Sequence, residues 1–186
     1  MGITELFHRW FFRQTDLEFL VGSWGGGPWR DGMDACTGII VNYSNTPVEL
    51  LESEQPLLVE RYGFIEDTGG AGEYRGGLTL KRHLRFLADE AVIQVRSDRR
   101  DIPPYGLDGG ATGSPSDVRI RRAGGEIEQQ PSNILTSLHR GDVREFKLAS
   151  GGGYGDALNR DPQRVLNDVY EETISIAHAA TAYGVV

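Results

Sequence analysis

The chain has 186 residues, of which 39% are hydrophobic and 25% are charged. A chain of this length and composition can bury a core of ordinary size, and the composition excludes wholesale disorder. The net charge of −8 gives no electrostatic basis for binding DNA, RNA or an anionic membrane surface.

Glycine and cysteine are the two informative residue types. The 25 glycines gather at positions 25–32, 63–77, 106–113 and 151–155, and such clusters mark tight turns or close approach of main-chain segments. Cys36 is the single cysteine, so no intramolecular disulfide can form, and we expect a reducing cytoplasm. Neither a signal peptide nor an apolar run long enough to span a membrane is recognisable.

At the N-terminus, the pattern predicts an amphipathic helix over residues 3–12. Apolar side chains recur there at helical spacing, namely Ile3, Leu6, Phe7, Trp10 and Phe11. This face is expected to cover the chain's own core or to dock on another chain. Residues 1–24 are accordingly expected to be an N-terminal helix or extension, separate from the domain formed by residues 25–186.

From about residue 37 to 148 the pattern indicates strands. A short apolar run at 38–41 is followed by an extended segment at 58–62. Leu78, Leu80, Leu84 and Phe86 then alternate with polar residues, and Arg82 is the exception on their face. Later candidates are centred on the apolar residues Ile93, Val95, Val118, Ile120 and Val143. The prediction is a mainly β fold, a sandwich or a barrel with glycine-rich loops.

At the C-terminus the apolar residues recur at helical spacing. Asp161 and Pro162 have the types preferred at the N-cap and first position of a helix. A second short helix is expected to begin at Ser175 and to end at Gly184, which occupies the position favoured by a C′ glycine.

Most local catalytic signatures are absent. No Walker A loop, G-x-G-x-x-G, G-x-S-x-G or H-E-x-x-H is found, and the four histidines are scattered at positions 8, 83, 139 and 178. Cys36 could be a nucleophile but is more typical of a packed side chain. His83 is expected to be solvated. The acidic run of Glu49, Glu52 and Glu54 is expected to be a solvated loop or strand edge, with a role in orienting a substrate, a metal or a loop in a larger assembly as the alternative.

Two polar stretches have both a structural and a functional interpretation. Residues 98–101, Asp-Arg-Arg-Asp, are typical of charged pairs that brace loops, although a substrate role is also open. Residues 151–156, GGGYGD, could hold an anion through backbone N–H groups. A tight structural turn is favoured, because the next helix begins only after Asp161.

Taken together, the glycine-rich segments resemble one protein family. The string DTGGAGEYRGG at 67–77 is similar to the form DSGGAGxxRGG of the hydantoinase B/oxoprolinase family. The resemblance continues in order through NTPVE at 45–49, PPYGL at 103–107, GGGYGD at 151–156, RDP at 160–162 and YGVV at 183–186. It covers residues 25 to the end and only the C-terminal part of the family's domain. Ala157, Asn133 and residues 171–175 depart from the usual family pattern.

The resemblance implies a subunit or fragment of an ATP-dependent cyclic-amide hydrolase that is inactive alone. Its implied partners are an ATP-binding subunit of the hydantoinase A type and the N-terminal portion of hydantoinase B. ATP and a divalent metal are implied for the full complex, but no cofactor or metal site is assigned to this chain. A carboxylase subunit of the acetone type and a non-catalytic remnant are the alternatives.

No catalytic residue is assigned from the sequence. If any side chain of this chain reaches the substrate, we expect Asp67, Arg75, Asp98 or Arg99. Loop bracing is the competing account for each of these four residues.

Overall fold

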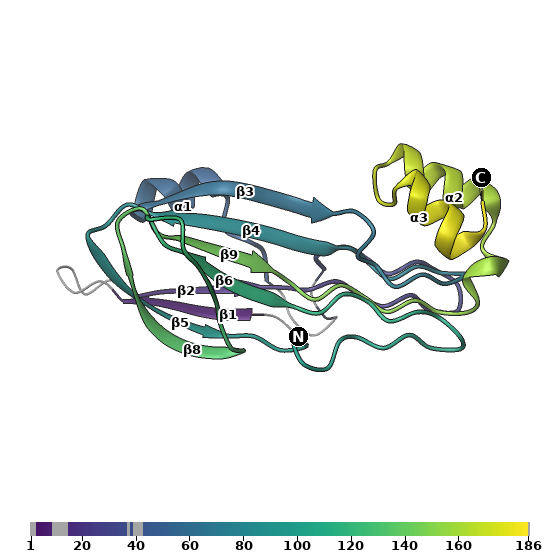
Figure 1. Ribbon diagram of the computed structural model, residues 1–186, viewed down its shortest axis with the longest axis horizontal. Helices are drawn as coiled ribbons and strands as arrows, with labels where there is room; N and C mark the ends of the chain where they lie inside the picture. Colours follow the sequence, from purple (N-terminus) through teal and green to yellow (C-terminus); the bar gives the residue numbers. More distant parts are fainter. Residues whose placement is uncertain (1–2, 9–14, 37, 39–42, 186) are drawn as a thin grey trace.

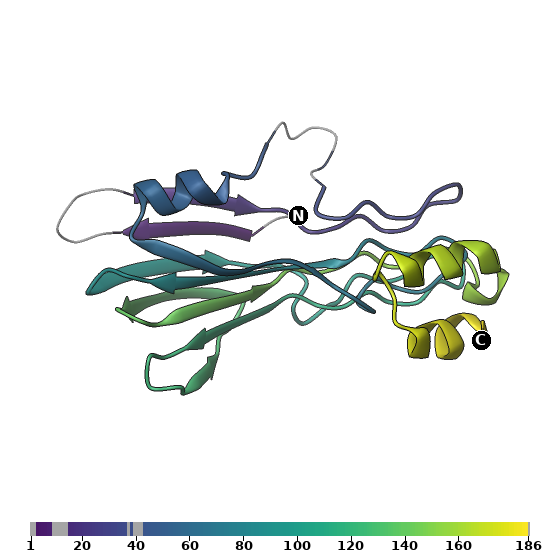
Figure 2. The same ribbon diagram turned by 90° about the horizontal axis from the view of Figure 1, so that it is seen from above.

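The computed structural model describes residues 3–8, 15–36, 38 and 43–185. Two antiparallel sheets form one end of the molecule, and two helices lie at the other (Figure 1). Long irregular segments rich in glycine run between these ends, as the view from above also shows (Figure 2). The predicted mainly β fold is confirmed.

The first sheet has the order β2-β1-β5-β8 and the second the order β3-β4-β9-β6-β7. Every pairing between neighbouring strands is antiparallel. The described strands therefore form two open sheets and not one closed barrel. The strand bounds are β1 Ile3–His8, β2 Thr15–Leu20, β3 Leu57–Ile65, β4 Thr79–Phe86, β5 Glu90–Arg96, β6 Asp117–Arg121, β7 Ile127–Gln129, β8 Asn133–His139 and β9 Val143–Lys147.

The predicted N-terminal helix is wrong over residues 3–8, which form strand β1; residues 9–12 lie outside the described residues. β1 pairs with β2 on one side and with β5 on the other. The backbone groups of a central strand are satisfied from both sides, and this pairing outweighs a helical apolar pattern that spans only a few residues. The apolar run predicted at 38–41 also falls largely outside the described residues.

One hydrophobic core lies between the two sheets. The first sheet contributes Leu20, Ile93, Val95 and Leu138, and these pack with side chains of the second sheet, namely Leu57, Leu80, Leu84, Phe86, Val118, Ile120 and Phe146. The alternation predicted in β4 is confirmed. Burial of these side chains is the main source of stability at this end of the molecule.

Two arginines are buried within this apolar core. Arg82 is only 1% exposed and forms an ion pair with Glu18 of β2. The Arg144 guanidinium carbon lies 4.1 Å from the centroid of the Phe146 ring, and burial lowers the pKa of Arg144 well below its usual value. The exception in the β4 alternation is therefore explained, because Arg82 faces inward and meets a carboxylate there.

Four helical segments complete the fold in the part of the chain that the structure describes. α1 (Val48–Glu54) contacts β3 and was not predicted, and the expected loop or strand edge at Glu49, Glu52 and Glu54 is wrong. The short 3-10 helix η1 (Ala157–Asn159) leads into α2 (Pro162–Tyr170) and α3 (Ile176–Tyr183). As predicted, Asp161 caps α2 and Ser175 caps α3. Gly184 ends α3 with φ of 67°, a left-handed conformation that favours glycine.

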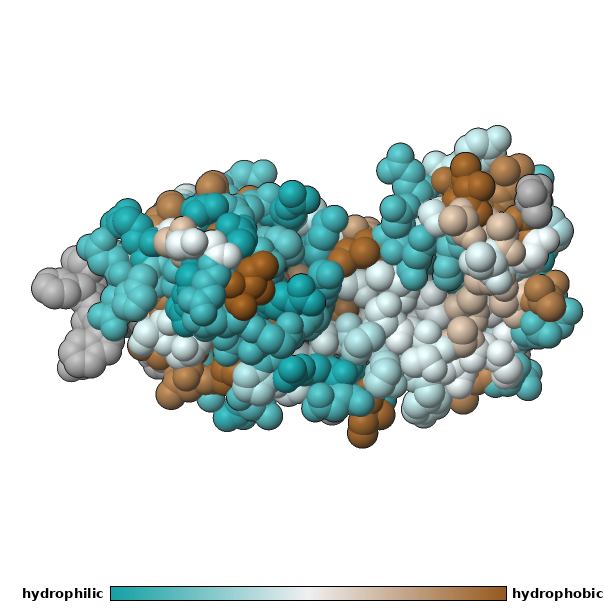
Figure 3. Space-filling model, in the orientation of Figure 1, coloured by the Kyte–Doolittle hydropathy of each residue, from teal (hydrophilic) through white to brown (hydrophobic). Residues whose placement is uncertain are grey.

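Four glycine-rich segments hydrogen-bond to one another through their main chains. Residues 23–27, 69–77, 104–113 and 150–155 form this feature, here called the glycine bundle. Bonds of 2.9 Å join Gly26 N to Gly152 O, Gly70 N to Gly151 O and Leu107 N to Gly153 O. Segment 150–155 is thus bonded to all three of the others. The region is pale, of intermediate hydropathy, in the space-filling view (Figure 3).

Close approach explains why glycine is required in the bundle. A Cβ atom on Gly70 would lie 2.3 Å from the carbonyl oxygen of Ala111, and one on Gly76 would lie 2.0 Å from that of Gly151. No real side chain tolerates such distances to backbone atoms. The glycine clusters in the sequence therefore correspond to the segments whose main chains pack against one another in this bundle.

Candidate functional site

A set of charged side chains, three buried and one half-buried, joins the glycine bundle to helix α2. Asp31, Arg75, Arg160 and Asp168 are here called the charge network. The Arg160 guanidinium bonds Asp31 Oδ1 at 2.7 Å and Asp168 Oδ2 at 2.6 Å, and it also donates to Glu73 O at 3.0 Å. Arg75 Nε donates to Asp168 Oδ1 at 3.2 Å. Three distant parts of the chain, around residues 31, 73–75 and 160–168, thus meet at one point.

Turns and helix α2 hold Asp31, Arg160 and Asp168 in position for this network. Asp31 follows the turn at 27–30, and its Oδ1 also accepts the backbone N–H of Arg75 at 2.8 Å. Arg160 lies between η1 and α2, and Asp168 lies on α2. Arg164, one turn further into α2, adds a bond from Nη2 to Asp31 Oδ2 at 2.5 Å.

The pKa shifts of Asp31 and Arg160 both favour their ionised forms. Burial acts to raise the pKa of Asp31, but the hydrogen bond and charge of Arg160 and the charge of Arg164 outweigh it, so the pKa is lowered. Burial acts to lower the pKa of Arg160, but bonds to Asp31 and Asp168 leave it raised. Burial likewise raises the pKa of the neighbouring Tyr183 to about 12. Every charge here is compensated by a partner.

Two of the four residues that the sequence suggested as substrate contacts, Arg75 and Asp67, form hydrogen bonds that stabilise the fold. Arg75 is buried and bonded to Asp168 and to Gly76 O. Asp67 has φ of 61°, and its Oδ1 accepts the backbone N–H of Ser175 at 2.7 Å, which fixes the start of α3. Both contacts brace loops.

The other two candidates lie in a different region. The carbonyl oxygen of Asp98 accepts the hydroxyl of Ser116, and the carbonyl oxygen of Arg99 accepts the Ser116 N–H at 3.1 Å. The Arg99 side chain is exposed and lines a cavity of about 220 Å³, together with Tyr105 and residues 149–152. The four candidates are therefore not brought together in one site.

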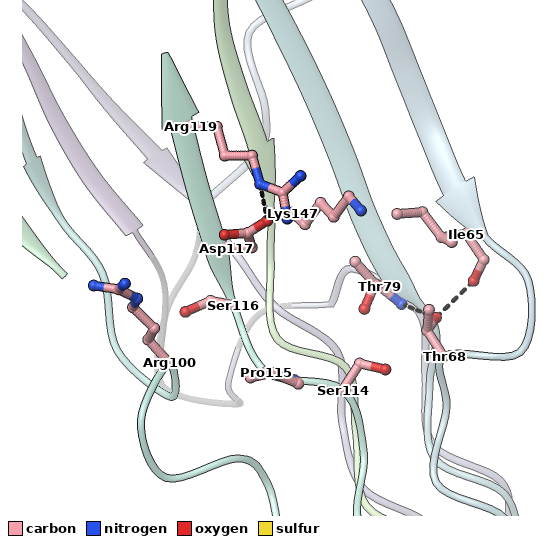
Figure 4. Close-up of a pocket in the computed structure, with 10 residues that line it drawn as sticks. All are labelled: Ile65, Thr68, Thr79, Arg100, Ser114, Pro115, Ser116, Asp117, Arg119 and Lys147. Carbon is pink, nitrogen blue, oxygen red and sulfur yellow. Dashed lines mark hydrogen bonds and ion pairs between the residues drawn. The ribbon is translucent and has the colours of Figure 1, made fainter. Parts of the chain in front are cut away.

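A larger cavity of about 410 Å³ lies where β4, β6 and β9 meet the glycine bundle (Figure 4). Arg100 lines it, so neighbouring residues of the 98–101 stretch face two different cavities. Sequence reasoning missed the remaining polar lining residues, because strand pairing brings them together from four segments: Thr68, Thr79, Ser114, Ser116, Asp117, Arg119 and Lys147. Hydroxyl and cationic side chains thus dominate this cavity.

The residues considered for nucleophilic or metal chemistry remain apart. Among the side chains that the structure describes, no three of the His, Cys, Asp and Glu type gather as a metal site. Cys36 is half-buried. His83 is half-buried rather than fully solvated, and burial lowers its pKa. The donor set available here does not match the divalent metal implied for the complex, and we derive no step through that metal.

The glycine run 151–155 does not present a cradle for an anion. The N–H groups of Gly151, Gly153, Tyr154 and Gly155 donate to Gly77, Ala111, Tyr74 and Leu107, at 2.8–3.0 Å. These donors are already bonded within the bundle, so their role is structural. The run crosses the bundle as a segment bonded to its neighbours and does not form the tight turn that was expected. No helix of the described chain has the length and hydropathy needed to cross a membrane.

Comparison with known proteins identifies similar sequences. The profile of the family described as hydantoinase B/oxoprolinase matches residues 8–157. A putative D-/L-hydantoinase component from Pseudomonas sp. (strain NS671) is 36% identical over 172 residues, covering 91% of this chain and 29% of that protein. The beta chain of the caprolactamase from Pseudomonas jessenii is 32% identical over 176 residues, covering 91% and 30%. Both proteins are named as subunits.

Two solved structures share the fold. The ATP-dependent caprolactamase from Pseudomonas jessenii gives a TM-score of 0.78 at 26% identity, covering 98% of this chain and 34% of that chain. The nucleotide-free structure of acetone carboxylase gives 0.76 at 17% identity, covering 100% and 29%, and at that identity it shows the fold alone. The chain spans about a third or less of the length of these relatives.

Proposed function

Since the chain belongs to the hydantoinase B/oxoprolinase family, we propose that it is part of an ATP-dependent hydrolase that opens the C–N bond of cyclic amides. The main support for this proposal is the match of the family profile to residues 8–157. The names of the similar proteins, a hydantoinase subunit and a caprolactamase subunit, support cyclic amides as the substrate class.

We further propose that this chain acts only together with partner chains. The hydantoinase and caprolactamase relatives are named as subunits, and the chain spans 29% and 30% of their lengths. The proposed partners are an ATP-binding subunit of the hydantoinase A type and a segment equivalent to the N-terminal portion of hydantoinase B. ATP and the divalent metal would be bound by these partners. A cytoplasmic location is proposed because the sequence has a single cysteine.

Within the complex, the charge network acts as a positioning device. It fixes the loops at 27–34 and 69–77 against α2, and Arg75 belongs to it, so a substrate contact for Arg75 is not proposed. Of the four sequence candidates, Arg99 has the most accessible side chain, because it is exposed and lines a cavity. We propose Arg99 as the residue of this set that reaches the substrate.

A carboxylase subunit is the second candidate function. It is favoured by the fold shared with acetone carboxylase. The 17% identity of that structure is well below the 36% and 32% shared with the hydantoinase and caprolactamase subunits. Cyclic-amide hydrolysis is therefore the leading proposal.

The test is an ATP hydrolysis assay on the reconstituted complex. The chain is combined with its ATP-binding subunit and the N-terminal portion, and phosphate release is measured with 5-oxoproline, hydantoin or caprolactam. Amide-dependent turnover that requires this chain supports the proposal. Turnover by the chain alone contradicts its dependence on partners, whereas no turnover in the complete mixture supports the non-catalytic remnant.

The role of Arg99 is tested in the same assay. Arg99→Gln is expected to raise the KM for the amide at least tenfold. Arg61→Gln is a matched control, because Arg61 is also exposed but lies on β3 and lines neither cavity. Equal KM values for the two variants would contradict substrate contact by Arg99.

A further inference from the structure

The larger cavity differs in charge from the rest of the molecule. Arg100, Arg119 and Lys147 contribute three cationic groups, and Asp117 contributes one carboxylate. The lining therefore carries a net charge of +2, in a chain whose net charge is −8. Such a local reversal favours anionic ligands over neutral or cationic ones.

Some of the polar groups that line this cavity already form hydrogen bonds or ion pairs within the protein. Arg119 Nε lies 2.7 Å from Asp117 Oδ2, so this pair neutralises itself. The Thr68 hydroxyl donates to Ile65 O at 2.6 Å, and the hydroxyl of Ser116 donates to the carbonyl of Asp98. These contacts hold the walls of the cavity in place, as the dashed lines in Figure 4 show for the first two pairs.

The side chains of Arg100, Lys147 and Thr79 also line the cavity but form no such ion pair or side-chain hydrogen bond in the described part of the protein. Arg100, which is half-buried, and Lys147, which is exposed, form no ion pair with any side chain in the described part of the protein. Thr79 is 1% exposed, and its hydroxyl has no hydrogen-bond partner there. Figure 4 shows this hydroxyl between Lys147 and Ser114. A buried hydroxyl without a hydrogen-bond partner lowers the stability of the fold, so its presence here calls for an explanation.

We propose that this cavity binds a small-molecule oxyanion, a carboxylate or a phosphate. Arg100 and Lys147 supply uncompensated positive charge, and the hydroxyl of Thr79 donates a hydrogen bond to an anionic oxygen that enters the cavity. A volume of about 410 Å³ accepts a metabolite-sized ligand. The inference is independent of the proposed hydrolase activity, because it depends only on the groups that line the cavity.

The test is calorimetric titration of the full chain with two probes at constant ionic strength in sodium chloride. Inorganic phosphate represents the phosphate source, and glutarate represents the carboxylate source. We expect saturable binding of at least one probe, and the tighter probe identifies the ligand class. The absence of saturable binding of both probes at millimolar concentration would overturn the proposal.

Variants then locate the binding. Arg100→Gln and Lys147→Met are each expected to raise Kd at least tenfold. Arg61→Gln removes one positive charge from an exposed site outside the cavity, and its Kd is expected to stay within twofold of the wild type. Equal weakening by all three variants would show a non-specific charge effect and would overturn the assignment.

Thr79→Val provides a readout that does not depend on charge. It keeps the β-branched shape in β4 but removes the unpartnered hydroxyl. We expect the free energy of unfolding to be unchanged or raised, while Kd for the bound probe rises at least threefold. A hydroxyl without a role in binding would leave Kd unchanged, and that result would contradict the proposed donor.

Discussion

Replacing Arg160 with methionine should destabilise the protein more than any other change in the charge network. The Arg160 side chain is 1% exposed, and the side chains of its partners Asp168 and Asp31 are 8% and 23% exposed. Arg160→Met leaves both carboxylates without their main cation, although Arg75 and Arg164 remain nearby. Breaking a buried ion pair from one side costs about 3–5 kcal/mol, which we expect here.

Two companion variants separate geometry from charge. Arg160→Lys keeps the charge but loses the planar fork that bonds both carboxylates, so an intermediate loss of about 1–3 kcal/mol is expected. Arg164→Gln removes one contact to Asp31 from a side chain that is 37% exposed, and at most about 1 kcal/mol should be lost.

The assay is urea unfolding followed by circular dichroism, with the free energy of unfolding extrapolated to water. The expected order of stability is wild type, Arg164→Gln, Arg160→Lys and then Arg160→Met. A loss below about 1 kcal/mol for Arg160→Met would refute the reasoning, because it would mean that the two carboxylates find equivalent partners or water without Arg160.

Three further predictions concern the bundle, a helix cap and pH. Gly70→Ala should cost about 2–3 kcal/mol or abolish folding, because its Cβ would lie 2.3 Å from Ala111 O; Gly124→Ala, with open space around it, should change the urea midpoint little. Asp161→Ala should remove the cap of α2 and cost about 1 kcal/mol by the same assay. The lowered pKa of Asp31 means that its stabilising effect is present above its ordinary pKa of about 3.9 and is lost as pH falls through the lower folded value. The stability gap between wild type and Asp31→Asn should therefore narrow below about pH 4, and a constant gap would contradict the assignment.

The parts of the fold that could be predicted are those with strong local signals. Alternating apolar residues located β4, and Asp161, Ser175 and Gly184 marked the helix ends, because each residue type has a direct local cause. The helix expected at residues 3–12 failed over β1, where the outcome depends on pairing with β2 and β5. Those contacts are not visible in the local pattern.

The candidate sites were harder to predict because their members are far apart in the chain. Asp31 and Arg160 are separated by 129 positions, and no spacing rule relates them. The resemblance to the family marked the RDP segment that contains Arg160, but it did not indicate the pairing with Asp31. The lining of the larger cavity was missed for the same reason, since Thr79, Ser114 and Lys147 meet only after β4, β6 and β9 have paired.

The glycine bundle has a thermal consequence that distinguishes it from the two sheets. Opening it would expose mainly peptide groups, and hydration of polar surface lowers the heat capacity, whereas hydration of apolar surface raises it. The sheets, with Leu84, Ile120 and Phe146 fully enclosed, contribute most of the positive heat-capacity change of unfolding. Cooling therefore weakens the packing of the two sheets before it weakens the glycine bundle.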